Sequence, residues 1–265
     1  EDEEKWDQKR EELVREIKEN NINQKYSKSK VENIDQIRKT SIWIFILPVV
    51  ALNLCLFVSV NYHLFENTIF VVDQVGRTGF TIPYIDGNVS ISRTARAYPT
   101  YLIFKPTMIF TAILLIKYWI ANNRLVGIAN NETNKNKYFF IFGVGSALFL
   151  ILHSIFLGIK FDYDLYKFFR RFVILGFIIF EIIAQALLVI SIFKIKEKIE
   201  KFINKKILIL KIILVSILAV TALASIPFLV SSGYTHFKHA LEWNYFIGVS
   251  LFYFLSFLFW KKGKA

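Results

Sequence analysis

The chain has 265 residues, of which 54% are hydrophobic and 20% are charged, and its formal net charge is +12. An ordinary soluble domain carries about a quarter charged residues spread through all of its elements, whereas here the charges are separated by long apolar runs. This composition excludes a soluble globular domain and predicts an all-α, polytopic membrane protein. The single cysteine, Cys55, also excludes an intramolecular disulfide framework and a cysteine-based zinc site.

Residues 1–40 form a polar N-terminal extension. Four apolar residues recur at helical spacing near its start: Trp6, Leu13, Val14 and Ile17. They predict a short amphipathic helix, and the turn-prone sequence at 20–30 predicts a linker after it. This helix would lie either on the membrane surface or in solvent, and its acidic start favours the solvated position. No basic segment precedes an apolar core here, so the extension is not interpreted as a secretory signal peptide.

Residues 41–262 contain six apolar runs that are long enough to cross a membrane as helices. The predicted spans are residues 42–60, 102–121, 139–159, 172–193, 207–230 and 245–260. The last run is short, so we expect its helix to begin near His239, which would give it enough length to cross. The sequence therefore predicts one six-helix transmembrane domain after the polar extension.

Three kinds of residue near the span ends carry further expectations. Prolines in or near the spans should kink their helices without ending them: Pro48, Pro106 and Pro227. Tryptophans at the span ends should lie at the headgroup level: Trp43, Trp119, Trp243 and Trp260. Lysines near the span ends should extend toward the membrane surface: Lys105, Lys117 and Lys211.

The distribution of Lys and Arg predicts the orientation in the membrane. About twice as many lie on the side of the N-terminal extension as on the opposite side, which predicts that both termini are cytoplasmic or on the equivalent side. The basic excess then serves topology and contact with anionic headgroups. No nucleic-acid-binding motif accompanies it, so we expect membrane lipids, and not nucleic acid, as partners.

The one long connection, at 61–101, lies on the outer side of this topology. Three of its segments, 69–75, 79–85 and 88–93, resemble short strands separated by Gly and Pro. A connection of this length is usually functional or packed as a cap.

The end of this outer loop contains a candidate phosphate site. Arg93 and Arg96 lie beside Ser92 and Tyr98, directly before the second span. Guanidinium groups match phosphate oxygens in a bidentate manner, and a lipid headgroup is the nearest source of phosphate. The alternative is that the arginines simply extend to the membrane surface.

Polar residues inside the spans form a second candidate. Glu181 lies near the middle of the fourth span, with Gln185 one turn further on the same face. A carboxylate at this depth costs several kcal/mol, so it should face the bundle interior, where it is either functional or a protonated packing group. His153 in the third span is predicted at a similar depth and could pair with Glu181, or it could be a packing residue.

A third candidate lies before the last span, where His236, His239 and Glu242 recur every three residues and share one helix face. Such a set could hold a metal or move protons. The alternative is the surface end of a helix anchored by Trp243. Because the sequence identifies no ligand from another helix, we expect no metal and no other cofactor.

The outer loop and the last span resemble the Frag/DRAM/Sfk family of six-span membrane proteins. The matching positions before and in the second span are Pro83, Tyr84, Ile91, Ser92, Pro99, Ile103 and Phe104. The last span opens with Glu242 and Trp243, similar to the Glu-aromatic pair of that family. The resemblance covers about residues 42–262 and implies a role in membrane lipid handling, such as remodelling of lipid anchors or distribution of lipids.

Three functions follow as hypotheses. The first is lipid handling, with headgroup recognition by the outer arginines. The second is an accessory subunit of a larger membrane complex, whose spans pack against other membrane subunits. The third is a membrane-embedded hydrolase whose catalytic residues would come from one set: His153, Glu181, His236, His239 and Glu242. The sequence leaves open whether the protein is an enzyme.

Overall fold

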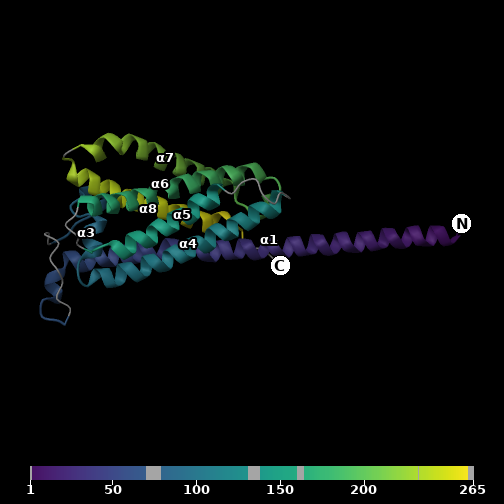
Figure 1. Ribbon diagram of the computed structural model, residues 1–265, viewed down its shortest axis with the longest axis horizontal. Helices are drawn as coiled ribbons and strands as arrows, with labels where there is room; N and C mark the ends of the chain where they lie inside the picture. The colour runs from purple at the N-terminus through teal and green to yellow at the C-terminus, as the bar shows by residue number, and fades with distance from the viewer. Residues whose placement is uncertain (1, 70–78, 131–137, 160–163, 232, 262–265) are drawn as a thin grey trace.

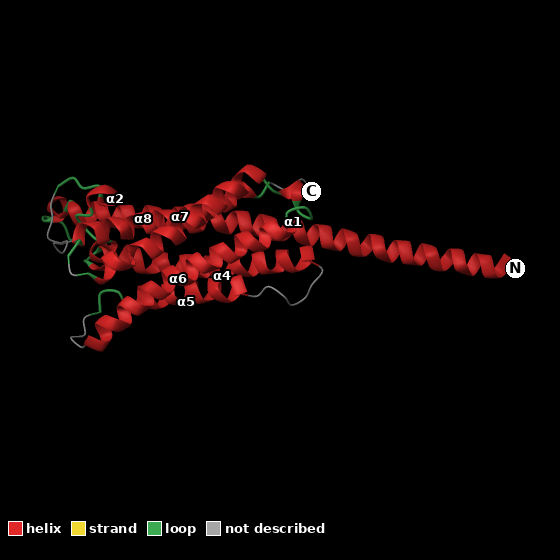
Figure 2. Cartoon of the chain, turned by 90° about the horizontal axis from the view of Figure 1, so that it is seen from above, coloured by secondary structure: helices red, strands yellow, loops and turns green. Residues whose placement is uncertain are grey.

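The computed structural model describes residues 2–69, 79–130, 138–159, 164–231 and 233–261. Within these residues the chain is helical and forms no strands (Figures 1 and 2). The elements in order are α1 (Asp2–Val60), η1 (Tyr62–Phe65), α2 (Pro83–Asp86), α3 (Ile91–Arg96), α4 (Thr100–Asn130), α5 (Tyr138–Phe156), α6 (Asp164–Ile195), η2 (Glu200–Phe202), α7 (Lys205–Val230) and α8 (Thr235–Phe259).

Six of the described helices are long and apolar enough to cross a membrane, which confirms the all-α polytopic fold. They pack side by side as one elongated bundle (Figure 1). Large apolar side chains remain exposed along its flanks, for example Ile217, Val220 and Leu223 on α7. Such a surface is stable against lipid tails and unstable in water. The helices continue through Pro48, Pro106 and Pro227, as expected.

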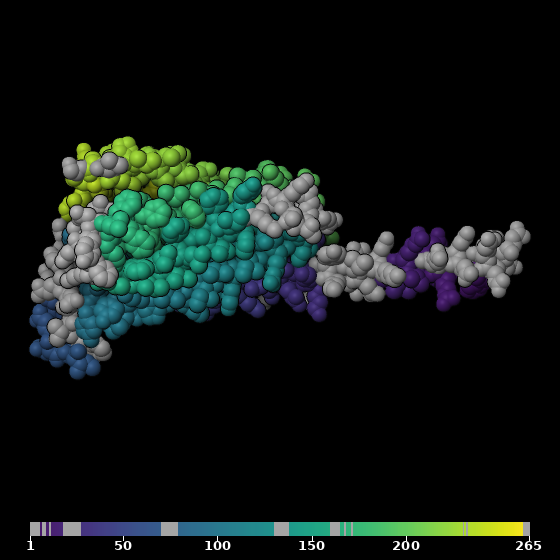
Figure 3. Space-filling view, viewed as in Figure 1, coloured from purple at the N-terminus to yellow at the C-terminus, as the bar shows by residue number. Residues whose placement is uncertain are grey.

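Helix α1 is continuous from Asp2 to Val60, so the linker expected at 20–30 is wrong. No Pro or Gly interrupts this part of the chain, and polar residues such as Asn, Gln and Lys are only mildly unfavourable in a helix. The N-terminal part of α1 extends beyond the bundle as a single helix (Figures 1 and 3). The C-terminal end of α8 lies at the same end of the bundle (Figure 1).

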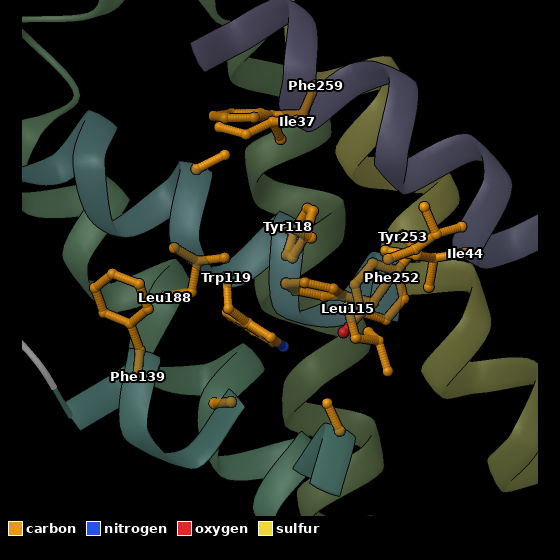
Figure 4. Packing of buried hydrophobic residues seen from close by; sticks show 14 of the residues in the cluster. Ile37, Ile44, Leu115, Tyr118, Trp119, Phe139, Leu188, Phe252, Tyr253 and Phe259 are labelled. Atoms are coloured by element: carbon orange, nitrogen blue, oxygen red, sulfur yellow. The ribbon is translucent and has the colours of Figure 1, made fainter. Parts of the chain in front are cut away.

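Large aromatic side chains fill the centre of the bundle. Trp119 and Tyr118 of α4 are fully buried and lie near Phe139 of α5 and Tyr253 of α8 (Figure 4). Three of the four tryptophans expected at the headgroup level are therefore inside the protein, because Trp243 and Trp260 are also at most 1% exposed. Only Trp43 is half exposed, as a surface indole should be.

Glycines let the aromatic rings of neighbouring helices approach the backbone of α5 and α6. A Cβ atom at Gly143 would lie 2.3 Å from the Trp119 ring, and one at Gly145 would lie 2.7 Å from the Phe180 ring. Real Cβ atoms do not approach other atoms so closely, so these two helix positions need glycine for packing.

The loop between α1 and α4 packs as a cap over the end of the bundle opposite the N-terminal extension, which is called the outer end below (Figure 1). Two of the three strands expected in this loop are wrong. Segment 79–85 contains the start of α2, where Pro83 occupies the first turn and Gly87 ends the helix with φ 57°. Segment 88–93 contains the start of α3, whose N-cap Ser90 accepts a hydrogen bond from the amide of Arg93. Most of segment 69–75 lies outside the described residues.

Helix α8 holds this cap in place, and begins at Thr235, one turn before the expected start. The buried Trp243 indole donates a hydrogen bond to the Val89 carbonyl (2.9 Å), and its ring packs edge-on against Tyr84. The Asn244 amide donates to the Tyr84 carbonyl (2.7 Å). These contacts fix α2 and α3 relative to the membrane helices.

Candidate lipid site and buried polar residues

Helix α3 presents two arginines at the outer end of the bundle. Arg93 and Arg96 are exposed, one turn apart on the helix. Partial burial, followed by the charges of Arg170 on α6 and of Arg93, lowers the pKa of Arg96. The guanidinium groups of Arg93 and Arg170, from two helices, are therefore near enough for their charges to repel that of Arg96. Among the described residues none of the three forms an ion pair with a carboxylate.

This repulsion makes the cluster a place where an anion would bind favourably, because an anion would compensate three charges at once. Arg170 was not identified from the sequence, since nothing there indicates that the start of α6 faces α3. Ser92 directly precedes Arg93 in the first turn of α3, whereas Tyr98 lies in the connection to α4, with its ring 6.1 Å from that of Tyr101.

Glu242 of α8 connects the membrane helices to α3. Its carboxylate accepts hydrogen bonds from the backbone amides of Ile91 and Ser92, in the first turn of α3. A carboxylate is favourable at this end of a helix, where the amides have no partner within the helix. Glu242 therefore fixes the position of the segment that carries Arg93 and Arg96.

The other two members of the expected histidine set serve the cap in different ways. His239 lies with its Nδ1 atom 3.0 Å from the Gly87 carbonyl, and His236 is exposed, with its backbone packed closely against Gly87. Although the three residues share a helix face, their side chains do not converge on one point. Within the described chain no group of three or more His, Cys, Asp or Glu residues is placed to hold a metal ion.

A cavity lies inside the bundle, lined by residues from α1, α3, α4, α5, α6 and α8. Its empty space, including the part open to the surroundings, is about 840 Å³. Most of its lining is aliphatic or aromatic, with Ile91, His153 and Glu242 among the residues at its outer level and Glu181 and Tyr253 at its inner level.

Glu181 is fully buried and is the centre of a hydrogen-bond network that joins three helices. It accepts hydrogen bonds from Ser146 of α5 (2.5 Å), from Gln185 one turn along α6 (3.0 Å) and from the Tyr253 hydroxyl of α8. The prediction that Glu181 faces the interior is confirmed. The prediction that it pairs with His153 is wrong: its partner on α5 is Ser146, about 10 Å deeper along the helix than His153, and the His153 ring instead packs edge-on against Phe104.

Lys211 of α7 is a second buried polar group, and the sequence interpretation of it was wrong. Its side chain does not extend to the membrane surface; it is 1% exposed and donates to the Ser256 hydroxyl (2.8 Å). Its ammonium group lies over the Phe252 ring, 4.1 Å from the centroid. The Ser256 hydroxyl is also 3.0 Å from that of Tyr118. No sequence pattern along α7 distinguishes Lys211 from a lysine that faces lipid, because the residues that surround Lys211 belong to α4 and α8.

Comparisons with protein-family models, with curated proteins and with solved structures find no significant match to the chain.

Proposed function

We propose that the protein handles membrane lipids by recognising an anionic headgroup at its outer surface, with Arg93, Arg96 and Arg170 binding the phosphate. The observation that carries the proposal is the proximity of Arg93 and Arg170 to Arg96 at the end of a membrane-spanning bundle, with no carboxylate partner among the described residues. Phosphate is the anion present in quantity at a membrane surface. Guanidinium groups bind it through paired hydrogen bonds.

The proposed orientation places the arginine cluster away from the cytoplasm. The Lys-rich connections belong to the end of the bundle that carries the N-terminal extension, and this end faces the cytoplasm or its equivalent by the distribution of positive charge. The headgroup would then belong to the outer leaflet. This is the class of role that the resemblance to the Frag/DRAM/Sfk family implies, in which lipid anchors are remodelled or lipids are distributed.

The experiment is to purify the protein in mild detergent and to quantify the lipids that remain bound. The double variant Arg93→Gln with Arg96→Gln should lose at least tenfold of its anionic phospholipid relative to zwitterionic phospholipid, since each charge-assisted hydrogen bond is worth about 1.5–3 kcal/mol. Arg124→Gln is the matched control, because Arg124 is exposed near the opposite end of α4. Unchanged lipid content and identity in the double variant would contradict the proposal.

A second candidate function is an accessory subunit of a larger membrane complex. It is favoured by the projecting part of α1, where Trp6, Leu13 and Ile17 lie on one face and are 52–75% exposed. An apolar stripe of this kind is stable when it packs against another helix. Deletion of residues 2–27 should then release the protein from a large assembly in native gels. A wild-type protein that migrates as a single chain after mild extraction would contradict this function.

A further inference from the structure

The internal cavity extends deep into the membrane region. Phe104 and Leu115 both line it on α4, and at 1.5 Å rise per residue they are about 16 Å apart along the bundle. Glu242 and Tyr253 mark a similar length on α8. The cavity is therefore elongated along the direction of the helices.

The outer level of the cavity adjoins the arginine cluster. Ile91 lines the cavity and is two residues before Arg93 on α3, and Ile174 lines it one turn after Arg170 on α6. Arg170 is also near enough to His153, another lining residue, for its charge to act there. Figure 2 shows α5 and α6 apart from α7 and α8 at this end of the bundle. A ligand anchored at the arginines would thus have the cavity directly beneath it.

The chemistry of the lining favours an apolar occupant. The two carboxyl groups of the lining already have partners: Glu181 accepts from Ser146, Gln185 and Tyr253, while Glu242 accepts from the first turn of α3. The remaining lining is chiefly aliphatic and aromatic. A polar solute would gain few hydrogen bonds here and would lose those it makes with water, whereas a hydrocarbon chain would lose nothing.

We infer that this cavity binds one acyl chain of the anionic lipid whose phosphate is held by the arginine cluster. The inference rests on the proposed function for the headgroup and adds the site of the tail. An extended chain advances about 1.25 Å per carbon–carbon bond of 1.52 Å, so the 16 Å length accommodates about a dozen carbons. The chain end would lie near Glu181 and Tyr253.

The test uses the full chain in nanodiscs of phosphatidylserine and phosphatidylcholine that contain a trace of phosphatidylserine with a photoreactive diazirine at the end of one acyl chain. After illumination, mass spectrometry of peptides locates the crosslinks. We expect them near Leu115, Ile178 and Tyr253, on the cavity side of α4, α6 and α8. Crosslinks confined to exposed positions such as Ile113 and Ile179 would overturn the inference, because a free lipid in the bilayer would give that pattern.

Two neighbouring residues of α6 provide a matched pair of variants. Ile178 lines the cavity, whereas Ile179 is 51% exposed on the lipid-facing side. Ile178→Trp fills the cavity and should lower the crosslinks inside it roughly tenfold, as expected when extra atoms occupy a binding space. Ile179→Trp adds the same ring outside and should leave them unchanged. Equal crosslinking in both variants would overturn the inference, and the thermal unfolding midpoint of each variant confirms that it is folded.

The variant Arg93→Gln with Arg96→Gln separates the two proposals. If both are correct, it lowers the preference for the phosphatidylserine probe over a phosphatidylcholine probe with the same diazirine chain. If the wild type gives no crosslinks in the cavity, but its crosslinks elsewhere prefer the phosphatidylserine probe and this preference falls in the double variant, the headgroup proposal stands. The acyl-chain site is then refuted. If the wild type and the double variant crosslink the phosphatidylserine probe equally inside the cavity, the tail site stands and the arginine headgroup site is refuted.

Discussion

The close approach of α4 and α5 gives a sharp prediction about stability. Gly143→Ala places a Cβ atom 2.3–2.5 Å from three atoms of the Trp119 ring. The indole is fully buried among other aromatic rings and cannot move away. Replacing a helical Gly with Ala contributes about 1 kcal/mol of stability by itself, but overpacking costs about 1–3 kcal/mol. Because the clash is with a rigid ring on several atoms, we expect the upper end of that cost and a net loss of about 2 kcal/mol.

Gly127→Ala is the matched control, since it lies inside α4 and a Cβ atom there has nothing within 4 Å. It should gain about 0.5–1 kcal/mol from the same change in helix propensity. The assay is reversible unfolding of both variants in mixed micelles with increasing denaturing detergent. The two variants should differ by about 3 kcal/mol, with opposite signs relative to the wild type. If Gly143→Ala is as stable as Gly127→Ala, then Trp119 does not pack closely against α5 at Gly143.

Three further predictions concern the buried polar groups and the outer cap. Lys211→Met keeps the aromatic contacts and removes a buried amino group that has no carboxylate within ion-pair distance among the described residues. Unfolding in mixed micelles should therefore show equal or higher stability than the wild type, and a loss of stability above about 1 kcal/mol would contradict this prediction. Trp243→Phe removes the hydrogen bond to the Val89 carbonyl and leaves a buried acceptor unpaired, which should lower stability by about 1–3 kcal/mol. Hydrogen exchange in α2 and α3 should rise, and unchanged exchange there would show that this bond does not hold the cap. Burial alone would raise the pKa of Asp86, but hydrogen bonds from the Asn88 amide, from Thr81 and from the Ile82 amide outweigh burial and lower this pKa. The ionised carboxylate therefore stabilises the cap above about pH 4, and this stability is lost as the pH falls through the lowered pKa of the folded state. Asp86→Asn should remove this pH dependence from hydrogen exchange in α2.

Hydrophobic run length predicted the six spans well because the cost of exposing backbone and polar groups to lipid restricts each crossing to one apolar helix. The same reasoning could not predict which residues of different helices contact one another. Trp119 and Lys211 sit near the ends of apolar runs, where lipid-facing residues of the same type also occur. The structure buries both because other helices cover those positions.

The outer loop shows the complementary limit. Short apolar segments separated by Gly and Pro were interpreted as strands, but Pro83, Gly87 and Ser90 start and end helical turns. The arginines of α3 were singled out because guanidinium groups match phosphate oxygens and these two lie directly before a span. Arg170 and the role of Glu242 toward α3 depend on the packing of segments distant in the chain. The candidate site was therefore predicted in part, and its cavity was not predicted.

The most direct test of lipid recognition is an experimental structure of the protein in nanodiscs that contain phosphatidylserine. Density for a phosphate group should lie within hydrogen-bonding distance of Arg96 and at least one of Arg93 and Arg170, at about 3 Å. Guanidinium groups that extend into solvent without such density, or that are neutralised by carboxylates of the chain itself, would contradict the proposal.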